Sequence, residues 1–526
     1  MLGKIPFVAC LDVCSRLIQV LEFGNANHEE KERLFKEVFS PEVGARYEAF
    51  LAQKPTEQAV LMHPFPLLFL IKAGATFSPR EPVEVDLSQY ANDLVRLVFA
   101  VWGHLNRKAE GYIRQDADAV IYAMAQRSMM ARPPMPWARA HGLYDDARPS
   151  VLLERTDALA EIGREFRAAS GLSIRELIQG TSLIHWFYQD NSIEQFVKNG
   201  RPLIPETFPA NKAGKLIIGK VAGQLSCPIE QLCSECSSER QPDGGITESL
   251  VALKRHPLVE LAAGYQLCVS PNLVAEAAIE RPIRSLETNA IGRGDMGALN
   301  EIRRKFGVIF EDYVHWLFRT QFPQNYFLIG RDERAERADG AIIDPKGIVI
   351  VECKAQRLVE SRRYEISDYA AALEGLRRLK IEKAASQILA TAKGLIRGEL
   401  RLDGIRLTLG CPIGSLIVAY EDQPVSSTTD RLFSPILFQT QRFDGHLILQ
   451  PQIIDVAEAE ELRSIRGNHT LLELLLRKDR DRKYGRESLR LYAQKALGAR
   501  TSWDHNRVLA KDFLEKHLVG LLAEDH

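Results

Sequence analysis

The sequence lacks any apolar run long enough to cross a membrane. Its densest early apolar stretches, residues 5–11 and 64–71, are far shorter than the roughly 20 residues that a spanning helix needs. Asp12 and Arg16 follow the first stretch at once, so it does not have the form of a secretory signal. These absences favour a cytoplasmic protein that does not contact membranes.

Cysteine is scarce, and neither sign of charge dominates. Eight cysteines among 526 residues do not suggest a disulfide framework. The formal net charge is −1, so no overall field attracts nucleic acid, and any binding of nucleic acid must use local basic surfaces. A Walker-type glycine-rich loop with Gly-Lys-Ser/Thr is also missing, which argues against a chain that powers its own translocation.

The remaining composition is ordinary for a globular protein of several domains, with 45% hydrophobic and 26% charged residues. Apolar periodicity predicts a helical domain over residues 1–132 and a second mainly helical region over residues 138–290, with the Pro-rich segment 131–137 between them. Residues 300–422 combine strand and helix patterns, and residues 423–526 are expected to form an α/β extension with basic helices. We therefore predict a multidomain α+β protein.

A β-hairpin is predicted within the third region. Two short apolar runs, residues 341–343 and 348–351, flank Asp344-Pro-Lys-Gly347, whose composition is typical of a tight turn. A hairpin centred on this turn places Asp339 opposite Glu352, with Cβ atoms about 4.5–5.5 Å apart. Two carboxylates are therefore expected to meet at the open end of the hairpin.

Strand alternation puts Lys354 on the same face as Glu352, while Cys353 points the other way. Paired carboxylates repel each other unless a cation separates them, and oxygen ligands favour Mg²⁺, with Mn²⁺ as a substitute. We expect Asp339 and Glu352 to hold the metal, and the backbone carbonyl of Cys353 offers a further oxygen ligand. Lys354 would orient an attacking water and offset charge that develops on a phosphate.

Asp339 followed by Glu352-Cys-Lys354 resembles the signature of the PD-(D/E)xK, or restriction-endonuclease-like, nuclease superfamily. Ala338 stands where many members of that family have proline. Asp344 is a competing first acid, but it would lie roughly 17 Å along the strand from Glu352, too far to share an ion.

The resemblance covers residues 305–422 and implies an α/β core with the element order α-β-β-β-α-β. Segments with suitable patterns occur in that order: residues 307–318, 326–329, 341–343, 348–351, 379–397 and 414–420. By the same resemblance, Glu311 on the first helix reaches the metal through a water, the alternative being a charge at the rim of an apolar helix face. Gln387 and Lys383 on the second helix are candidates for contact with the scissile phosphate, the alternative being an exposed polar pair.

A zinc site is the competing metal hypothesis. Cys233 and Cys236 have the two-residue gap of a zinc pair, and Cys227, Cys268 or His256 could complete a set. Because the sequence has no second such pair, we favour ordinary buried cysteines over structural Zn²⁺.

Two further patterns carry weaker signals. Residues 292–297 match the letters GxGxxG, but no strand is predicted before them, so we expect a joint between helices instead of a nucleotide site. Residues 477–490 are rich in arginine and lysine, but acids interleave with them, so a solvated helix face is favoured over a track for phosphates.

The resemblance implies a metal-dependent nuclease that hydrolyses phosphodiester bonds, with DNA favoured over RNA as its substrate. Bacterial proteins that resemble this layout, with a long helical half before a nuclease core, are in some cases linked to defence against foreign DNA. The alternative is a non-catalytic adaptor that uses a nuclease-like fold as a docking scaffold, although a scaffold has no reason to keep repelling carboxylates together. The sequence leaves open a protein partner or activator that binds the helical half, and a homodimer.

Overall fold

The structure is a computed structural model, and every structural statement below concerns the part of the chain that it describes. The described residues are 3, 5–22, 64–79, 93, 96–97, 100–101, 136–189, 203–239, 249–262, 265–329, 336–357, 374, 377, 380–402, 407–420, 435–499 and 504–522. Most of the predicted linker, residues 131–135, therefore lies outside the described residues, as does most of the predicted N-terminal domain.

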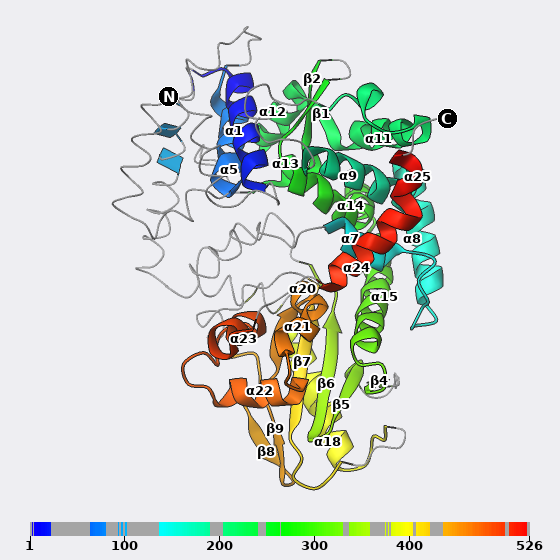
Figure 1. Ribbon diagram of the computed structural model, residues 1–526, viewed down its shortest axis with the longest axis vertical. Coiled ribbons are helices and arrows are strands. Elements are labelled where there is room, and N and C mark those ends of the chain that lie inside the picture. The colour runs from blue at the N-terminus through cyan, green and yellow to red at the C-terminus, as the bar shows by residue number, and fades with distance from the viewer. Residues whose placement is uncertain are drawn as a thin grey trace.

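The molecule is elongated, with a mostly helical half at one end and a half built on a large sheet at the other (Figure 1). The helices of the helical half are α1 (Phe7–Glu22), α5 (Pro64–Phe77), α7 (Pro136–Tyr144), α8 (Arg155–Ser170), α9 (Ile174–Gln189), η3 (Pro205–Thr207), α11 (Lys212–Leu225), α12 (Ile229–Ser238), α13 (Val251–Arg255) and α14 (Pro271–Gly292). A small sheet of β1 (Ser226–Pro228), β2 (Leu258–Ala262) and β3 (Tyr265–Cys268) completes this half. The described part of this half is thus mostly helical, with three short strands in addition.

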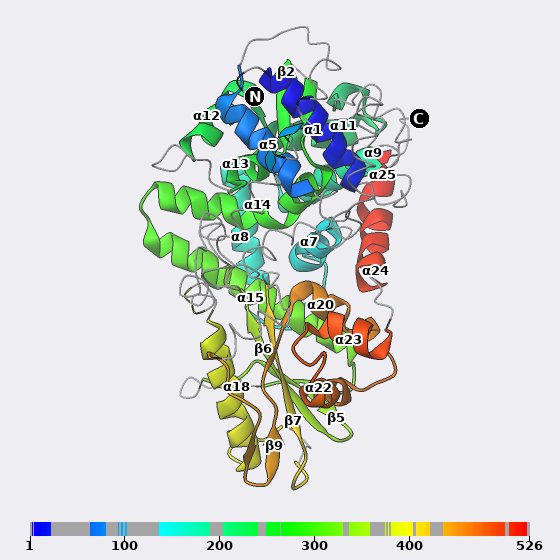
Figure 2. The same cartoon turned by 90° about the vertical axis from the view of Figure 1, so that its left-hand side faces the viewer.

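The end of the chain returns to the helical half. Helix α24 (Asp504–Phe513) continues into the π-helix η4 (Leu514–Leu518) and α25 (Val519–Leu522), and this segment runs beside α7 and α11 (Figures 1 and 2). The Asn211 backbone amide donates a hydrogen bond to the Leu521 carbonyl at 3.0 Å. The predicted C-terminal extension therefore contributes to both ends of the molecule.

Within the described residues the large sheet has seven strands, some antiparallel and some parallel to their neighbours. Strands β4 (Tyr326–Leu328), β5 (Gly340–Asp344) and β6 (Gly347–Lys354) are antiparallel neighbours, and β7 (Ile413–Ala419) lies parallel to β6. Helix α15 (Met296–Gln321) precedes β4, and α18 (Ile381–Ile396) lies in the connection from β6 to β7. This element order is the helix, three strands, helix and strand that the sequence predicts.

The sheet continues beyond residue 422, where the predicted nuclease core ends. Strands β9 (His446–Ile448) and β10 (Gln452–Asp455) pair in parallel with successive parts of β7, and β8 (Gln441–Phe443) pairs with β9. Pro451 lies between β9 and β10, where its missing amide cannot support a continuous ladder. The uniformly buried β7 is thereby covered on both edges.

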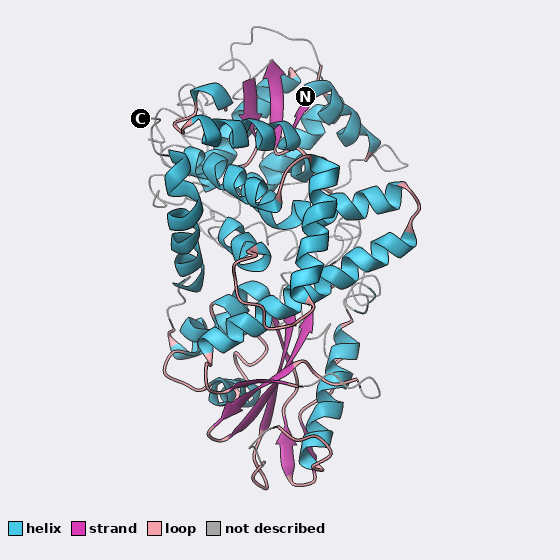
Figure 3. Ribbon diagram, turned by 90° about the vertical axis from the view of Figure 1, so that its right-hand side faces the viewer, coloured by secondary structure: helices cyan, strands magenta, loops and turns pink. Residues whose placement is uncertain are grey.

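Helices cover both faces of the large sheet (Figures 2 and 3). Ile348 and Ile350 of β6 belong to the hydrophobic cluster that includes α18, whereas Val349 and Val351 belong to the cluster that includes α15. The α15 side also holds α20 (Val456–Glu460) and α22 (Leu471–Arg480), with α21 (Leu462–Arg466) and α23 (Leu489–Leu497) beside them. Strand alternation therefore decides which helix each side chain of β6 meets.

The hydrophobic clusters do not follow the predicted divisions of the chain. One cluster joins α1 and α5 to α12, α13 and β3, so the described N-terminal helices pack against residues 227–273. A second extends from α7 through α14 and α15 to the sheet and to α24. None of the helices in the described part of the chain is long and apolar enough to span a membrane.

Helices α14 and α15 are joined by the glycine-containing segment that the sequence predicts to be a joint. Gly294 adopts a left-handed backbone with φ of 69°, and the Asp295 side chain accepts a hydrogen bond from the Ala298 amide at 2.9 Å to cap α15. The segment follows a helix and not a strand, which excludes the fold context of a dinucleotide fingerprint.

A buried carboxylate on α15 fixes this helix to the helical half. Asp312, which is 0% exposed, accepts hydrogen bonds from Arg148 Nη2 at 2.7 Å and from the Val151 and Leu152 amides at 2.6 Å each. Arg155 Nε lies 3.3 Å from the same carboxylate. Because a buried charge is costly without such partners, these contacts hold α15 against the loop between α7 and α8.

A second buried group reinforces the junction. Arg139 on α7 donates two hydrogen bonds to Glu460 on α20, at 2.7 and 2.9 Å. Tyr313, the residue after Asp312, donates to Glu460 Oε1 at 2.9 Å. Consecutive side chains of α15 therefore bind two distant parts of the sequence, residues 148–155 and helix α20.

Candidate active site

The hairpin has the predicted turn. Asp344 pairs with Gly347, and Ala341 pairs with Ile350, as a turn centred on Pro345-Lys346 requires. A side chain at Gly347 would bring Cβ to 2.1 Å from the Pro412 carbonyl oxygen, so only glycine fits there. The Asp344 carboxylate accepts the Lys346 amide at 3.0 Å, and this acid therefore stabilises its own turn, far from Glu352.

Asp339 departs from the regular ladder. Gly340 is the residue paired with Val351, yet the Asp339 amide donates to the Val351 carbonyl at 3.1 Å. The alignment of β5 with β6 thus shifts by one residue at Asp339. The prediction that Asp339 lies directly opposite Glu352 is therefore wrong, because the last residue pair of the two strands is Gly340 with Val351. The Asp339 carboxylate instead accepts the Cys353 amide at 2.7 Å, which places it along the edge of β6.

Glu352 and Lys354 project from β6 on the face that α18 covers. Glu352 is 1% exposed and Lys354 is 9% exposed, and the Lys354 ammonium pairs with Glu352 Oε1. The same ammonium donates to Gln387 Oε1 at 3.0 Å, and Gln387 Nε2 donates to the Arg337 carbonyl at 3.1 Å. Gln387 therefore links the lysine to the chain just before Asp339.

The two candidates on α18 have different surroundings. Lys383 forms an exposed ion pair with Glu336 at 2.6 Å, whereas Gln387 contacts the buried lysine. We expect Gln387→Ala to slow metal-dependent cleavage about 10- to 100-fold, because a hydrogen bond to a charged group contributes about 1.5–3 kcal/mol. Lys383→Ala, as the matched control on the same helix, should change the rate less than about twofold. Initial cleavage rates measure both, and equal losses in the two variants would contradict this assignment.

Glu311 approaches from the opposite face, with two partners that the sequence analysis did not single out. Its carboxylate lies 3.5 Å from His315 Nε2, one turn further along α15, and His315 Nδ1 bonds to the Tyr326 hydroxyl. A Cβ at Gly340 would fall 2.2 Å from that hydroxyl, so the glycine makes room for Tyr326. The four-residue spacing of Glu311 and His315 on one helix was the signal that could have identified the histidine.

The acids influence one another electrostatically. Desolvation and then the charge of Glu311 raise the pKa of Asp339 to about 6. Desolvation and then the charge of Asp339 raise the pKa of Glu352 to about 8, against the opposing effect of Lys354. Burial and the mutual repulsion of the acids thus act together against the opposing effect of Lys354, and a bound cation would favour the charged form of both carboxyls.

The donor set fits a hard divalent cation. Glu352 Oε2 is buried and has no hydrogen-bond partner among the described residues. The Cys353 carbonyl points toward β5, because the Cys353 amide does so and because the next residue, Lys354, accepts from Tyr420 on the β7 side. Asp339, Glu352 and the Cys353 carbonyl therefore offer oxygen atoms at one end of the hairpin, as Mg²⁺ or Mn²⁺ requires.

Glu311 does not form a compact triad with these acids. In the described residues, the criterion that ligand atoms of three side chains lie within 4.8 Å of one another is met by His141, Asp145 and His517, which lie elsewhere. Glu311 comes from the face covered by α15 and Glu352 from the face covered by α18. Glu311 is therefore not a third member of a compact ligand group with Asp339 and Glu352.

The cysteines of the competing zinc hypothesis are buried. Cys227, Cys233 and Cys236 lie in the cluster with α1 and α5, whereas Cys268 belongs to the larger cluster. His256 pairs with Glu235 at 3.1 Å. Within the described residues these cysteines do not form a compact group of three ligands.

The basic C-terminal stretch is partly structural. Lys478 is 3% exposed and donates to Gln452 Oε1 and to the Gly485 carbonyl, each at 2.6 Å. Arg490 pairs with Glu461 at 3.2 Å. These two cations stabilise the fold around β10 and α23, so they do not contribute to a track for phosphates.

The raised pKa of Glu352 predicts a pH effect on stability. Its value of about 8 in the folded protein exceeds the ordinary 4.5, so the folded state holds more protons than the unfolded state between these pH values. We therefore expect the metal-free protein to lose stability as pH rises from about 5 to 8, measured as the urea midpoint in EDTA. Glu352→Gln should flatten this decline, and Mg²⁺ should oppose it at pH 8 in the wild type. An identical pH slope in the variant would contradict the assignment.

Comparison of the chain with family models, with curated proteins and with solved structures found no match.

Proposed function

We propose that the protein is a metal-dependent nuclease whose active site is formed by Asp339, Glu352 and Lys354. The observation that carries this proposal is the buried carboxylate of Glu352, which has one oxygen on Lys354 and the other without a hydrogen-bond partner in the described residues. Asp339 adds a second negative charge beside it. Such an arrangement destabilises a fold unless a cation binds there, so a functional reason for it is favoured.

Each residue has a role that follows from its position. Asp339, Glu352 and the Cys353 carbonyl would hold Mg²⁺ or Mn²⁺, which supplies Lewis-acid polarisation of a phosphate oxygen and acidification of a water when bound. The Lys354 ammonium, held between Glu352 and Gln387, would donate hydrogen bonds to the attacking water and to the charged phosphate oxygens. Glu311 and His315 would bind a water on the far side of the site.

The substrate and role follow from the family resemblance of residues 305–422. DNA is favoured over RNA, and defence of a bacterial cell against foreign DNA is the role that resemblance implies. The helical half would then receive a protein partner or activator, and a homodimer would allow both strands of a duplex to be cut.

A substrate panel tests the proposal. The purified chain is incubated with supercoiled plasmid, linear duplex, single-stranded DNA and structured RNA, each with Mg²⁺, Mn²⁺ or EDTA. Cleavage that requires metal and is lost in Lys354→Met supports the nuclease and identifies its substrate class. If no substrate is cleaved, calorimetric Mg²⁺ titration of the wild type and of Asp339→Asn separates two cases. Mg²⁺ binding that is lost in Asp339→Asn indicates an enzyme that needs an activator. No Mg²⁺ binding at this site indicates a protein that is not a metal-dependent nuclease.

The second candidate is a non-catalytic adaptor, and the closure of the site favours it. Glu352 and Lys354 are almost entirely buried and paired with each other, so a phosphate must displace surrounding groups to reach them. The adaptor predicts no cleavage on any substrate and no metal binding that depends on Asp339.

A further inference from the structure

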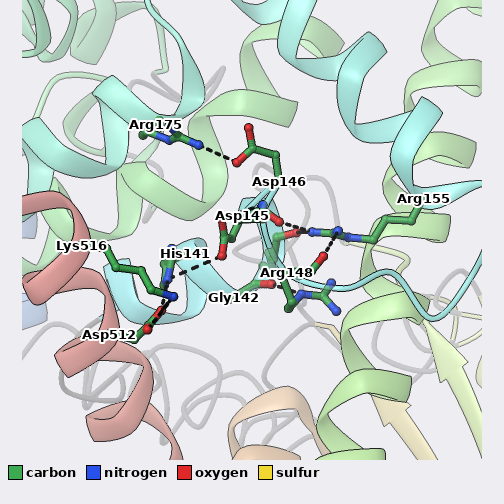
Figure 4. A network of polar contacts seen from close by, with 11 residues as sticks. His141, Gly142, Asp145, Asp146, Arg148, Arg155, Arg175, Asp512 and Lys516 are labelled. Carbon is green, nitrogen blue, oxygen red and sulfur yellow. Dashed lines mark hydrogen bonds and ion pairs between the residues drawn. The ribbon is translucent and has the colours of Figure 1, made fainter.

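A second group of potential metal ligands lies in the helical half, between α7 and the C-terminal segment. His141 is on α7, Asp145 follows that helix directly, and His517 is on η4. One ligand atom from each lies within 4.8 Å of the others. Figure 4 shows dashed lines from His141 to Asp145 and to Asp512, which comes from α24.

The distances suit a tetrahedral site. Metal–ligand distances of about 2.0–2.1 Å place neighbouring ligand atoms of a tetrahedral zinc site about 3.3 Å apart. His141 Nε2 lies 3.2 Å from Asp512 Oδ2 and 3.9 Å from Asp145 Oδ2. Asp145 Oδ1 accepts the Ala147 amide at 3.0 Å, which leaves the other oxygen directed toward the histidine. Asp512 is outside the group of three whose ligand atoms lie within 4.8 Å of one another, so its carboxylate would have to move toward Asp145 and His517 to complete a set of four.

The surrounding structure holds the rings in place. Phe513 contacts both imidazoles, with ring centroids 5.1 Å from His141 and 5.3 Å from His517. Gln179 Nε2 donates to the His517 carbonyl at 3.1 Å and anchors that backbone. His517 lies within a π-helical turn, an uncommon conformation that redirects side chains and is frequent at functional sites.

Other charged groups line the cluster without blocking it. Lys516 contacts both carboxylate oxygens of Asp512, at 2.7 Å from Oδ1 and 3.0 Å from Oδ2, and because its side chain is 57% exposed it could turn toward solvent when an ion takes its place. Arg175 is engaged by Asp146 on the outer side. His141 is 4% exposed, so an ion here would be shielded from water on the α7 side.

We propose that His141, Asp145 and His517 bind one Zn²⁺ ion, with Asp512 as the fourth ligand. Two imidazoles and two carboxylates form a donor set for zinc and not for Mg²⁺, which prefers oxygen ligands. The ion would fasten the C-terminal segment to α7, more than 350 residues earlier in the chain. This site is separate from Asp339 and Glu352 and does not depend on the proposed nuclease activity.

Metal analysis of the full chain tests the proposal. After removal of metals with chelator and addition of excess Zn²⁺ followed by dialysis, we expect about one equivalent of zinc per chain by elemental analysis. His517→Gln and Asp145→Asn should each weaken zinc binding more than about 100-fold in competition with a chromogenic chelator. His469→Gln is the matched control for loss of a histidine, and Glu352→Gln controls for zinc in the nuclease site; both should retain the ion.

Co²⁺ provides a readout that needs no variant. Tetrahedral coordination gives Co²⁺ a strong visible absorption band, which should appear in the wild type and be displaced by Zn²⁺. Three results would overturn the proposal: no zinc retained by the wild type, zinc retained equally by His517→Gln, or zinc lost from Cys236→Ser and not from His517→Gln. Circular dichroism confirms that each variant is folded before its metal content is compared.

Discussion

Glu352→Gln is expected to abolish metal-dependent cleavage, with a fall in rate of about 1,000-fold or more, while the protein stays folded. Glutamine keeps the shape of the side chain but removes the negative charge that would hold the cation. Loss of a bound Lewis acid removes several kcal/mol of transition-state stabilisation, and each 1.36 kcal/mol corresponds to tenfold in rate. Initial rates on the substrate identified by the panel measure the effect.

Stability should respond in the opposite direction to activity. In the absence of metal, the Glu352 carboxylate is buried beside Asp339, and its pKa is raised to about 8, so its neutral replacement should leave the urea midpoint at pH 8 unchanged or higher. Glu382→Gln, an exposed acid on α18, is the matched control and should alter neither quantity. Cleavage by Glu352→Gln at the wild-type rate would exclude the proposed site, and a collapse of the fold would show that the residue is structural.

Asp312→Asn is expected to cost about 3–5 kcal/mol of unfolding free energy, the usual consequence of removing one partner from a buried ion pair. The Asp312 carboxylate accepts from Arg148 and from two backbone amides, with Arg155 also within ion-pair distance. The neutral amide would leave both buried guanidinium groups without the carboxylate that they contact. Its NH₂ group would also face the guanidinium and backbone amide donors, and an NH₂ group cannot accept a hydrogen bond from them.

Urea denaturation followed by circular dichroism and by tryptophan fluorescence measures this loss. Glu301→Gln, which removes an exposed pair with Arg304 on the same helix, is the control and should cost less than about 1 kcal/mol. A loss for Asp312→Asn no larger than that of the control would mean that the buried network does not hold α15 in place.

The hairpin was predictable because its determinants are local. Apolar alternation and the Asp-Pro-Lys-Gly turn specify both strands and their register, and the structure confirms the pairing of Ala341 with Ile350. The position of Asp339 was less predictable, since the one-residue shift there depends on how the strand leaves the sheet. The alternation of apolar residues in the two strands does not indicate where the regular pairing of the strands ends.

Contacts between distant segments were not predictable from a single sequence. His315 and Tyr326 meet only because α15 crosses the start of β4, and β9 and β10 join the sheet only because β7 offers a free edge. His517 of the proposed zinc site was also not predictable. It lies more than 350 residues after His141, and ligands so far apart form no recognisable pattern in a sequence. Local rules therefore gave the elements, and tertiary packing decided their partners.

Consecutive residues of α15 serve opposite ends of the molecule. Glu311 belongs to the candidate active site, and Asp312 belongs to the arginine network of the helical half. A helix turns about 100° per residue, so the helix cannot rotate or slide on one side without displacing the other. Any molecule that binds the helical half and shifts α15 would change the metal affinity that we propose for Asp339 and Glu352. By thermodynamic reciprocity, metal at that site would change the affinity for that molecule by the same factor.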